Sequence, residues 1–394
     1  MTIKHNLVVL GDIAKISSGG TPSRSNPKYW NGNIPWIKTT QIQNCIINKS
    51  DVDECITEEG LKNSSAKMIP AGTILMAMYG QGKTRGQVSI LNFDASTNQA
   101  CAAIELTRGI YRDFVYQFLL ARYTHIRNMS NTGGQKNLSS GLIKEIPLLL
   151  PPLPEQKAIA NLLSTWDTAI EKTERLTLAK EKRLKGYIQR VISQRCDEWP
   201  HIKPKKIFET VTEKKFPDEE LLSVTQDRGV IPRSMLEGRV MSPNGTTASY
   251  KRIKRGDFAI SLRSFQGGIE YSNYQGIISP AYTVLRPAME INSGFYRLFF
   301  KSYIFIEKYL NLAVIGIRDG KQISIPDFLS IKIPIPPLEE QKQIAETLTA
   351  IRLEIDLLKQ LTEKYKTQKR GLMQKMLTGT WRVKPEIING YMEA

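Results

Sequence analysis

The chain has 394 residues and a formal net charge of +17, with 55 Lys and Arg against 38 Asp and Glu. Hydrophobic residues make up 41% of it, which excludes a disordered chain and allows sizeable cores. A globular chain this basic usually meets a polyanion, so we expect nucleic acid as a partner.

The scarcity of cysteine and histidine argues against a metal site. The chain has 4 cysteines without a CxxC pair and 3 scattered histidines. The N-terminus lacks an apolar core suited to secretion, and no stretch approaches the roughly 20 apolar residues of a membrane span. These features predict a cytoplasmic protein without a membrane partner.

Residues 1–150 are expected to form a mixed, β-rich domain. Short apolar runs flanked by Gly, Asn and Asp predict strands at Leu7–Leu10, Thr73–Tyr79 and Gln87–Leu91. Leucines and aromatics at helical spacing predict a helix over Asp113–Arg122. The prolines between residues 147 and 154 then favour an extended connector, after which a long helix is predicted from Glu155 to about Arg195.

This connector and helix occur twice. The run PPLPEQK starting at Pro151 and the run PPLEEQK starting at Pro336 align without a gap, and the match continues to Gly186 and Gly371. The repeat predicts two similar halves. The expected parts are a first globular domain (1–150), a connector and helix (151–195), a second globular domain (196–335), a connector and helix (336–380) and a C-terminal tail (381–394).

Apolar residues recur along both helices in a 4-3 rhythm. This rhythm indicates that the helices, each about 60 Å long, pack as a coiled coil. Alternatively, each helix packs on its own domain. The residues expected in the helix contact are Leu163, Trp166, Ile170, Tyr187, Leu348, Ile351, Ile355, Leu358, Leu372 and Met376.

Fainter matches link the globular parts. Ile69–Tyr79 parallels Ile253–Arg263, and Tyr116 parallels Tyr296. The predicted fold class is therefore α+β, with two mixed β-rich domains separated by two long helices and related by pseudo-two-fold symmetry.

Two glycine-rich loops in each half carry the side chains expected to touch DNA. Arg suits guanine and Asn or Gln suits adenine, whereas Lys more often contacts phosphate. The alternative is that these loops are solvated turns. The predicted set is Lys83, Arg85, Gln135, Lys136, Arg263, Gln266, Arg318 and Lys321.

Two motifs resemble fragments of catalytic sites. Gly80–Thr84 resembles the end of a phosphate-binding loop, but the required earlier glycine is Ala77 and a strand is expected to follow. Asn26–Tyr29 resembles a methyltransferase motif without its glycine-rich cofactor loop. No catalytic residue, metal ligand or cofactor site is predicted in this chain.

At the two PPLxEQK segments the chain resembles the specificity subunit of Type I restriction–modification systems. The loop Ser17–Ser23 (SSGGTPS) and the strand Ile34–Ile37 (IPWI) match the start of that family's target-recognition domains. The second half lacks an SGGTP loop near Lys203–Thr212.

The resemblance implies that each globular domain reads one half of a bipartite target in double-stranded DNA. The helices would pack as an antiparallel coiled coil and set the spacer between the half-sites. The chain would be non-catalytic and would join two methyltransferase (M) subunits and restriction/motor (R) subunits. Adenine methylation and restriction would use S-adenosylmethionine, ATP and Mg on those partners.

Two other interpretations remain open. An ATPase or methyltransferase with a decayed motif would bind ATP or S-adenosylmethionine by itself. A stand-alone DNA-binding or coiled-coil interaction scaffold would have no restriction partner, and a pure interaction module would bind DNA weakly and without regard to sequence.

Overall fold

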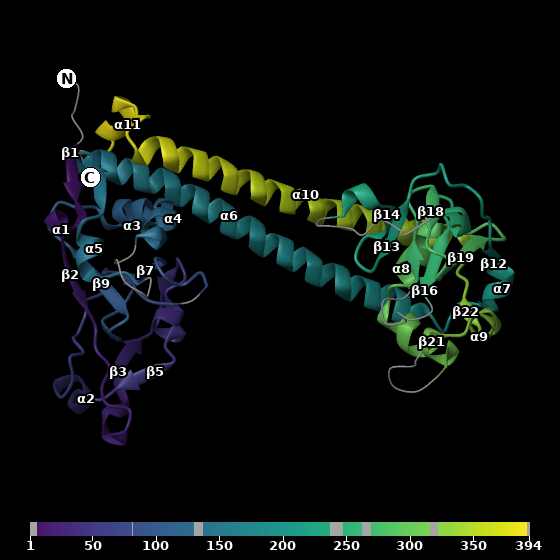
Figure 1. Ribbon diagram of the computed structural model, residues 1–394, viewed down its shortest axis with the longest axis horizontal. Coiled ribbons are helices and arrows are strands. Elements are labelled where there is room, and N and C mark those ends of the chain that lie inside the picture. The colour runs from purple at the N-terminus through teal and green to yellow at the C-terminus, as the bar shows by residue number, and fades with distance from the viewer. Residues whose placement is uncertain are drawn as a thin grey trace. The chain divides into compact units, whose positions relative to one another are not determined.

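The computed structural model describes residues 6–80, 82–129, 137–236, 247–261, 269–315 and 322–391. The chain divides into two compact units. Unit 1 comprises residues 1–173 and 361–394, and unit 2 comprises residues 174–360. Each unit therefore combines one globular domain with part of each long helix (Figure 1).

The largest sheet of unit 1 has five strands in the order β2-β9-β6-β7-β4. A three-stranded sheet, β5-β3-β8, and the antiparallel pair β1-β10 complete the strands described there. Their bounds are Asn6–Val9 (β1), Ala14–Ser18 (β2), Trp30–Ile37 (β3), Ile46–Ile47 (β4), Glu54–Ile56 (β5), Ile74–Ala77 (β6), Val88–Leu91 (β7), Ser96–Thr97 (β8), Cys101–Leu106 (β9) and Pro147–Leu150 (β10).

Short helices connect these strands. They are Leu10–Ile13 (α1), Glu58–Lys62 (α2), Arg112–Ala121 (α3), Tyr123–Asn128 (α4) and Ser140–Lys144 (α5). The predicted strands correspond to β1, β6 and β7, and the predicted helix to α3, so these predictions are confirmed to within a few residues. Leu10, expected at the end of a strand, instead begins α1.

Unit 2 contains a four-stranded sheet in the order β12-β19-β16-β17 and four strand pairs, β11-β22, β13-β14, β15-β18 and β20-β21. The strands are His201–Ile202 (β11), Phe208–Val211 (β12), Leu222–Thr225 (β13), Gly229–Pro232 (β14), Lys251–Ile253 (β15), Phe258–Ser261 (β16), Glu270–Tyr271 (β17), Gly276–Ile278 (β18), Tyr282–Pro287 (β19), Val314–Ile315 (β20), Gln322–Ile323 (β21) and Ile333–Pro334 (β22). The short helices are Pro204–Ile207 (α7), Ser293–Phe299 (α8) and Ile325–Ser330 (α9).

The two domains repeat one topology. The order β2-β9-β6-β7 in unit 1 corresponds to β12-β19-β16-β17 in unit 2, with antiparallel pairing throughout. In each domain the first strand pairs with the strand before the proline connector, β1 with β10 and β11 with β22. Tyr116 on α3 and Tyr296 on α8 are both buried. The faint sequence match between the globular parts therefore reflects a shared fold.

Both faces of the central strands are covered. In β6, Ile74 and Met76 join the main core of unit 1, whereas Leu75 joins a second cluster on the opposite face. In β16, Phe258 belongs to the main core of unit 2 and Ala259 to a smaller cluster. Alternate residues of a strand point to opposite faces, so continuous apolar runs mark strands buried on both sides.

Two long helices follow the proline connectors. The helix α6 spans Leu153–Ile188 and continues as a π-helix over Gln189–Gln194, and α10 spans Leu338–Leu377. Both begin directly after consecutive prolines and carry acidic residues in the first turn, where they suit the helix dipole. The two predicted long helices are confirmed.

The segment after α10 folds onto unit 1. A short helix, α11 (Pro385–Asn389), buries Ile388 in the main core, and Val383 is buried beside it. The side-chain amide of Asn161 on α6 donates to the hydroxyl of Tyr391 over 3.1 Å. The sequence analysis expected only a tail here, and it missed this packing.

Candidate nucleic-acid interface

In the first domain, Ala77 and Met78 at the end of β6 form backbone hydrogen bonds with residues next to both predicted DNA-contact loops. The first loop follows β6, where Gly86 donates its backbone N–H to Ala77 over 2.8 Å. The second loop ends at Leu138, whose N–H bonds the carbonyl of Met78 over 3.0 Å. Residues more than fifty positions apart are thus joined at the base of both loops.

Lys83 and Arg85 occupy the first loop. The Lys83 side chain is exposed, and its carbonyl accepts a 2.6 Å bond from the hydroxyl of Tyr123 on α4. Arg85 is half-buried and donates to the carbonyl of Arg127 over 3.0 Å. Arg127 in turn donates to the Tyr123 hydroxyl over 3.1 Å. The helix α4 therefore supports this loop, a role that sequence reasoning missed because it ended the helical segment at Arg122.

The other predicted contacts fall outside the described residues. These are Gln135, Lys136, Arg263, Gln266, Arg318 and Lys321. The residues that flank the last two are described, because Val314 pairs with Ile323 and Ile315 with Gln322 in the ladder β20-β21. All these DNA contacts, including those of Lys83 and Arg85, stay predictions.

The two catalytic look-alike motifs have structural roles. The strand β7 follows the Gly80–Thr84 segment, where a phosphate-binding loop would need a helix. Asn26 caps a short 3₁₀ helix, Pro27–Tyr29, and its side chain accepts the N–H of Lys28 over 3.1 Å.

Glycines let the Ser17–Ser23 loop run against its neighbours. A Cβ on Gly19 would lie 2.1 Å from the carbonyl oxygen of Thr97, and one on Gly20 would lie 2.3 Å from the backbone nitrogen of Ala66. No side chain fits in that space. The indole of Trp36 donates to the carbonyl of Gly20 over 2.9 Å, which joins this loop to β3.

Beyond this loop, an arginine lies on a tryptophan. The guanidinium carbon of Arg24 lies 3.7 Å from the ring centroid of Trp30, within cation–π range. Glu54 accepts bonds from Arg24 over 2.6 Å and from Lys38 over 2.7 Å. These two bonds lower the pKa of the Glu54 carboxyl. These contacts hold Arg24 in place, and the sequence analysis did not identify Arg24 as a candidate.

In unit 1 the two long helices contact each other. The rings of Trp166 and Tyr365 meet edge to face, with centroids 5.6 Å apart. Asp167 accepts bonds from Lys369 over 2.5 Å and from Gln117 on α3 over 2.7 Å. Lys369 occupies a position of α10 where the apolar spacing predicts a hydrophobic residue, and it is only 8% exposed. Its ion pair with Asp167 compensates for the burial of its charge.

In unit 2 the helix contact is more polar. Lys180 pairs with Glu354, and Glu181 pairs with Lys359, each over 2.7 Å. In unit 1 the first part of α6 meets the last part of α10, and in unit 2 the last part of α6 meets the first part of α10, so the helices are antiparallel. Of the predicted contact residues, four are buried and the others are half-buried; the buried ones are Leu163, Leu348, Ile355 and Met376, and the half-buried ones are Trp166, Ile170, Tyr187, Ile351, Leu358 and Leu372.

Both interpretations of the long helices hold in part. Leu163 and Met376 join the core of unit 1, and Leu348 joins that of unit 2. The ends of each helix are therefore packed into globular cores, while their middle parts contact the other helix. This double role explains why both copies kept a similar sequence while the rest diverged.

The glutamines of the two PPLxEQK motifs make the same contacts. The Gln156 side chain accepts the N–H of Tyr111 over 2.8 Å and donates to the carbonyl of Pro151 over 2.8 Å. Gln341 accepts the N–H of Asn292 over 2.9 Å and donates to the carbonyl of Pro336 over 2.8 Å. Each glutamine joins its connector to the globular domain.

The neighbouring glutamates bind the end of the opposite helix. Glu155, 1% exposed, accepts bonds from Arg382 beyond α10 over 2.7 and 2.6 Å. Glu340 pairs with Arg195 at the end of α6. The repeated motif is therefore a reciprocal lock: the start of each helix holds the arginine that follows the other.

The described part of the chain shows no cluster of metal-binding side chains. Within it, no group of three or more His, Cys, Asp or Glu is placed to hold a metal ion. Also within these ranges, no helix is long and apolar enough to cross a membrane.

A family model describes this architecture. The model named Type I restriction modification DNA specificity domain matches residues 4–180 and 197–366, one copy for each half. The chain belongs to this family. Its two specificity domains each end in one of the long helices, since the matches extend into α6 and α10.

Curated relatives carry the same domains. The Type I restriction enzyme MjaVIII specificity subunit of Methanocaldococcus jannaschii is 24% identical over 96% of this chain and 93% of that protein. The EcoR124I/EcoR124II specificity subunit of Escherichia coli is 31% identical over 45% of each chain.

Solved structures share the fold of these specificity domains. The S subunit of a Type I restriction–modification system from M. genitalium covers 95% of this chain and 96% of its own, with a TM-score of 0.56 and 16% identity. The HsdS subunit from Thermoanaerobacter tengcongensis covers 96% and 97%, with the same TM-score and identity. A further structure, from work on complex assembly of the Type I system, reaches a TM-score of 0.61 at 15% identity.

Proposed function

We propose that this chain is the DNA-specificity subunit of a Type I restriction–modification complex. One observation carries the proposal: two specificity domains with one topology, each joined to a long helix whose start is locked to the end of the other. Each domain reads one half of a bipartite, asymmetric target in double-stranded DNA, because the domains differ in sequence much more than the helices do.

The chain acts in this proposal as a non-catalytic scaffold. Two methyltransferase subunits and the restriction/motor subunits bind to it in the cytoplasm and supply the chemistry. Those partners hold S-adenosylmethionine for adenine methylation, and ATP and Mg for restriction. The net charge of +17 supports a polyanionic ligand, since neutralising phosphates releases their counterions.

Methylome sequencing tests this function directly. Cells that carry the chain with its methyltransferase partner should show N6-methyladenine in a two-part motif with an unread spacer of fixed length. Cells carrying the methyltransferase alone are the control and should lack that motif. Methylation in an unsplit motif, or methylation that does not depend on this chain, would instead favour a stand-alone scaffold without a restriction partner.

A further inference from the structure

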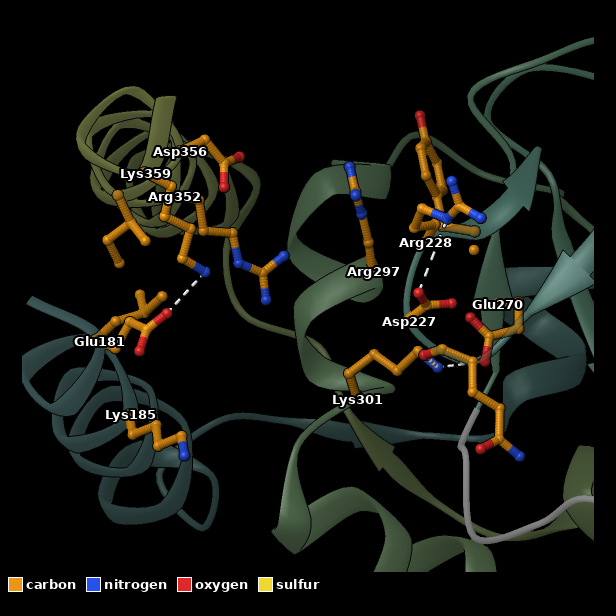
Figure 2. A pocket seen from close by; sticks show the side chains of 15 residues that line it. Glu181, Lys185, Asp227, Arg228, Glu270, Arg297, Lys301, Arg352, Asp356 and Lys359 are labelled. Atoms are coloured by element: carbon orange, nitrogen blue, oxygen red, sulfur yellow. Dashed lines mark hydrogen bonds and ion pairs between the residues drawn. The ribbon is translucent and has the colours of Figure 1, made fainter. Parts of the chain in front are cut away.

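Unit 2 contains a polar cavity of about 580 Å³. Its walls are the last part of α6, the middle of α10, α8 and the turn between β13 and β14 (Figure 2). Gly229 in that turn has a φ of +77°, and a Cβ there would lie 2.6 Å from the carbonyl oxygen of Tyr271. The turn can therefore approach β17 closely and close one side of the cavity.

Basic side chains outnumber acidic ones around this cavity. Six basic residues and four acidic residues line it. Three of the carboxylates are paired within the cavity: Glu181 with Lys359, Glu270 with Lys301 and Asp227 with Arg228. The lining that remains is Lys185, Arg297 and Arg352, opposed by Asp356.

Arg352 and Arg297 repel each other. Arg352 is half-buried and extends from α10 toward α8, which carries Arg297 (Figure 2). Burial, and to a lesser degree the charge of Arg297, lowers the pKa of the Arg352 guanidinium. Among the described residues no ion pair joins either arginine to a carboxylate. The charge of Asp356 offsets part of this effect on Arg352, and the guanidinium carbon of Arg297 lies 5.5 Å from the ring centroid of Tyr271. Two half-buried guanidiniums without an ion-paired carboxylate are still costly, and an anion bound between them would lower that cost.

At the equivalent position in unit 1 the charged side chains form an ion pair. The repeat aligns Arg352 with Asp167 and Leu184 with Lys369, and the faint domain match aligns Arg297 with Gln117. In unit 1, Asp167 accepts bonds from both Lys369 and Gln117. Unit 2 thus has two arginines at the positions where unit 1 has a carboxylate and an amide.

We propose that the cavity of unit 2 binds a phosphoryl group, with Arg352 and Arg297 as its ligands. The planar forks of two guanidiniums match the oxygens of phosphate, and such charge-assisted bonds are about twice as strong as neutral ones. The uncompensated lining carries two net positive charges, from three cations and Asp356. A free or terminal phosphate carries about −1.5 to −2 at pH 7 and so matches it better than a backbone diester.

Thermal unfolding of the full chain tests this site. We expect sodium phosphate to raise the midpoint by several degrees, saturably, relative to sodium chloride at equal ionic strength. Arg352→Gln and Arg297→Gln should each abolish the saturable rise. Without phosphate, Arg352→Gln should be at least as stable as the parent chain, because it removes a like-charge repulsion.

Matched variants separate site binding from general salt effects. Lys342→Gln, on the same helix but outside the cavity and paired with Glu339, should keep the full response. Phosphate also stabilises proteins by exclusion from their surface, and that effect should be equal in all variants. An equal response in the parent chain and both arginine variants would overturn a free-phosphate site.

A second arm distinguishes the source of the phosphoryl group. Binding of the parent and Arg352→Gln chains to an unphosphorylated duplex is measured across salt concentrations. A lower affinity and a salt slope reduced by about one unit in the variant would assign the site to the DNA backbone. If the variants match the parent chain in both the phosphate and the DNA measurements, the proposal is overturned. The phosphate arm does not depend on the proposed function, so failure of one leaves the other standing.

Discussion

Lys83 is the exposed cation of the described loop between β6 and β7, and its backbone is held by α4. We expect Lys83→Ala to weaken binding to all DNA sequences alike and to lower the salt slope by about one unit, as expected for a lost phosphate contact. Lys83→Arg keeps the charge and should keep the slope. Titrations of duplex DNA over a range of salt measure both quantities; loss on one sequence only would indicate base reading instead.

Glu54 gives the first domain a defined response to acid. Lys38 and Arg24 lower its pKa, so the stabilisation is present above the ordinary value of 4.5 and is lost as the pH falls through the lowered value. Glu54→Gln should therefore be less stable than the parent at neutral pH, and the difference should shrink as the pH falls below 4.5 and through the lowered pKa. Denaturant unfolding across pH measures this difference; a gap that stays constant would contradict the role of the carboxylate charge.

At the scale of elements, the glutamate–arginine locks hold the helix ends. Glu155 is buried and binds Arg382 through two bonds, so Glu155→Gln should lower the free energy of unfolding by about 2 kcal/mol. The matched control is Glu339→Gln, which removes an exposed carboxylate near the start of α10 and should change it by less than about 0.5 kcal/mol. Urea unfolding measures the free energy of unfolding of both variants. Equal losses would show that the Glu155–Arg382 ion pair contributes no more than an exposed pair.

Helix length is expected to set the DNA spacer. Removing seven residues from the middle of both α6 and α10 shortens each helix by roughly 10 Å, the length of about three base pairs. Because the same number is removed from both, the antiparallel pairing can be kept. Methylome sequencing should then show a shorter preferred spacer, and an unchanged spacer would refute the idea of a helical ruler.

At the scale of the whole molecule, the two halves should be separable in specificity. Replacing residues 196–335 with the second domain of another family member keeps the closing pair β11-β22 within the exchanged piece. The helices and the first domain stay unchanged. We expect one half of the methylated motif to change and the other to stay, which makes the unchanged half an internal control. Loss of both halves would contradict modular reading.

The repeat was readable from the sequence because its residues lie at fixed spacings along the chain. Consecutive prolines, acidic first turns and an apolar rhythm are local signals, and they predicted α6, α10 and the division into two domains. The strands β6 and β7 were predicted from continuous apolar runs, and α3 from helical spacing, for the same reason. The resemblance to Type I specificity subunits rested on these repeated segments.

Only the tertiary structure decided which distant residues meet. Lys369 reads as an interruption of the apolar rhythm until Asp167 and Gln117 lie beside it. Arg352 and Arg297 are far apart in the sequence, and only the structure shows that they face one cavity without an ion-paired carboxylate. Spacing along a chain fixes which side of a helix a residue occupies, but the charge across from it depends on packing between segments far apart in sequence.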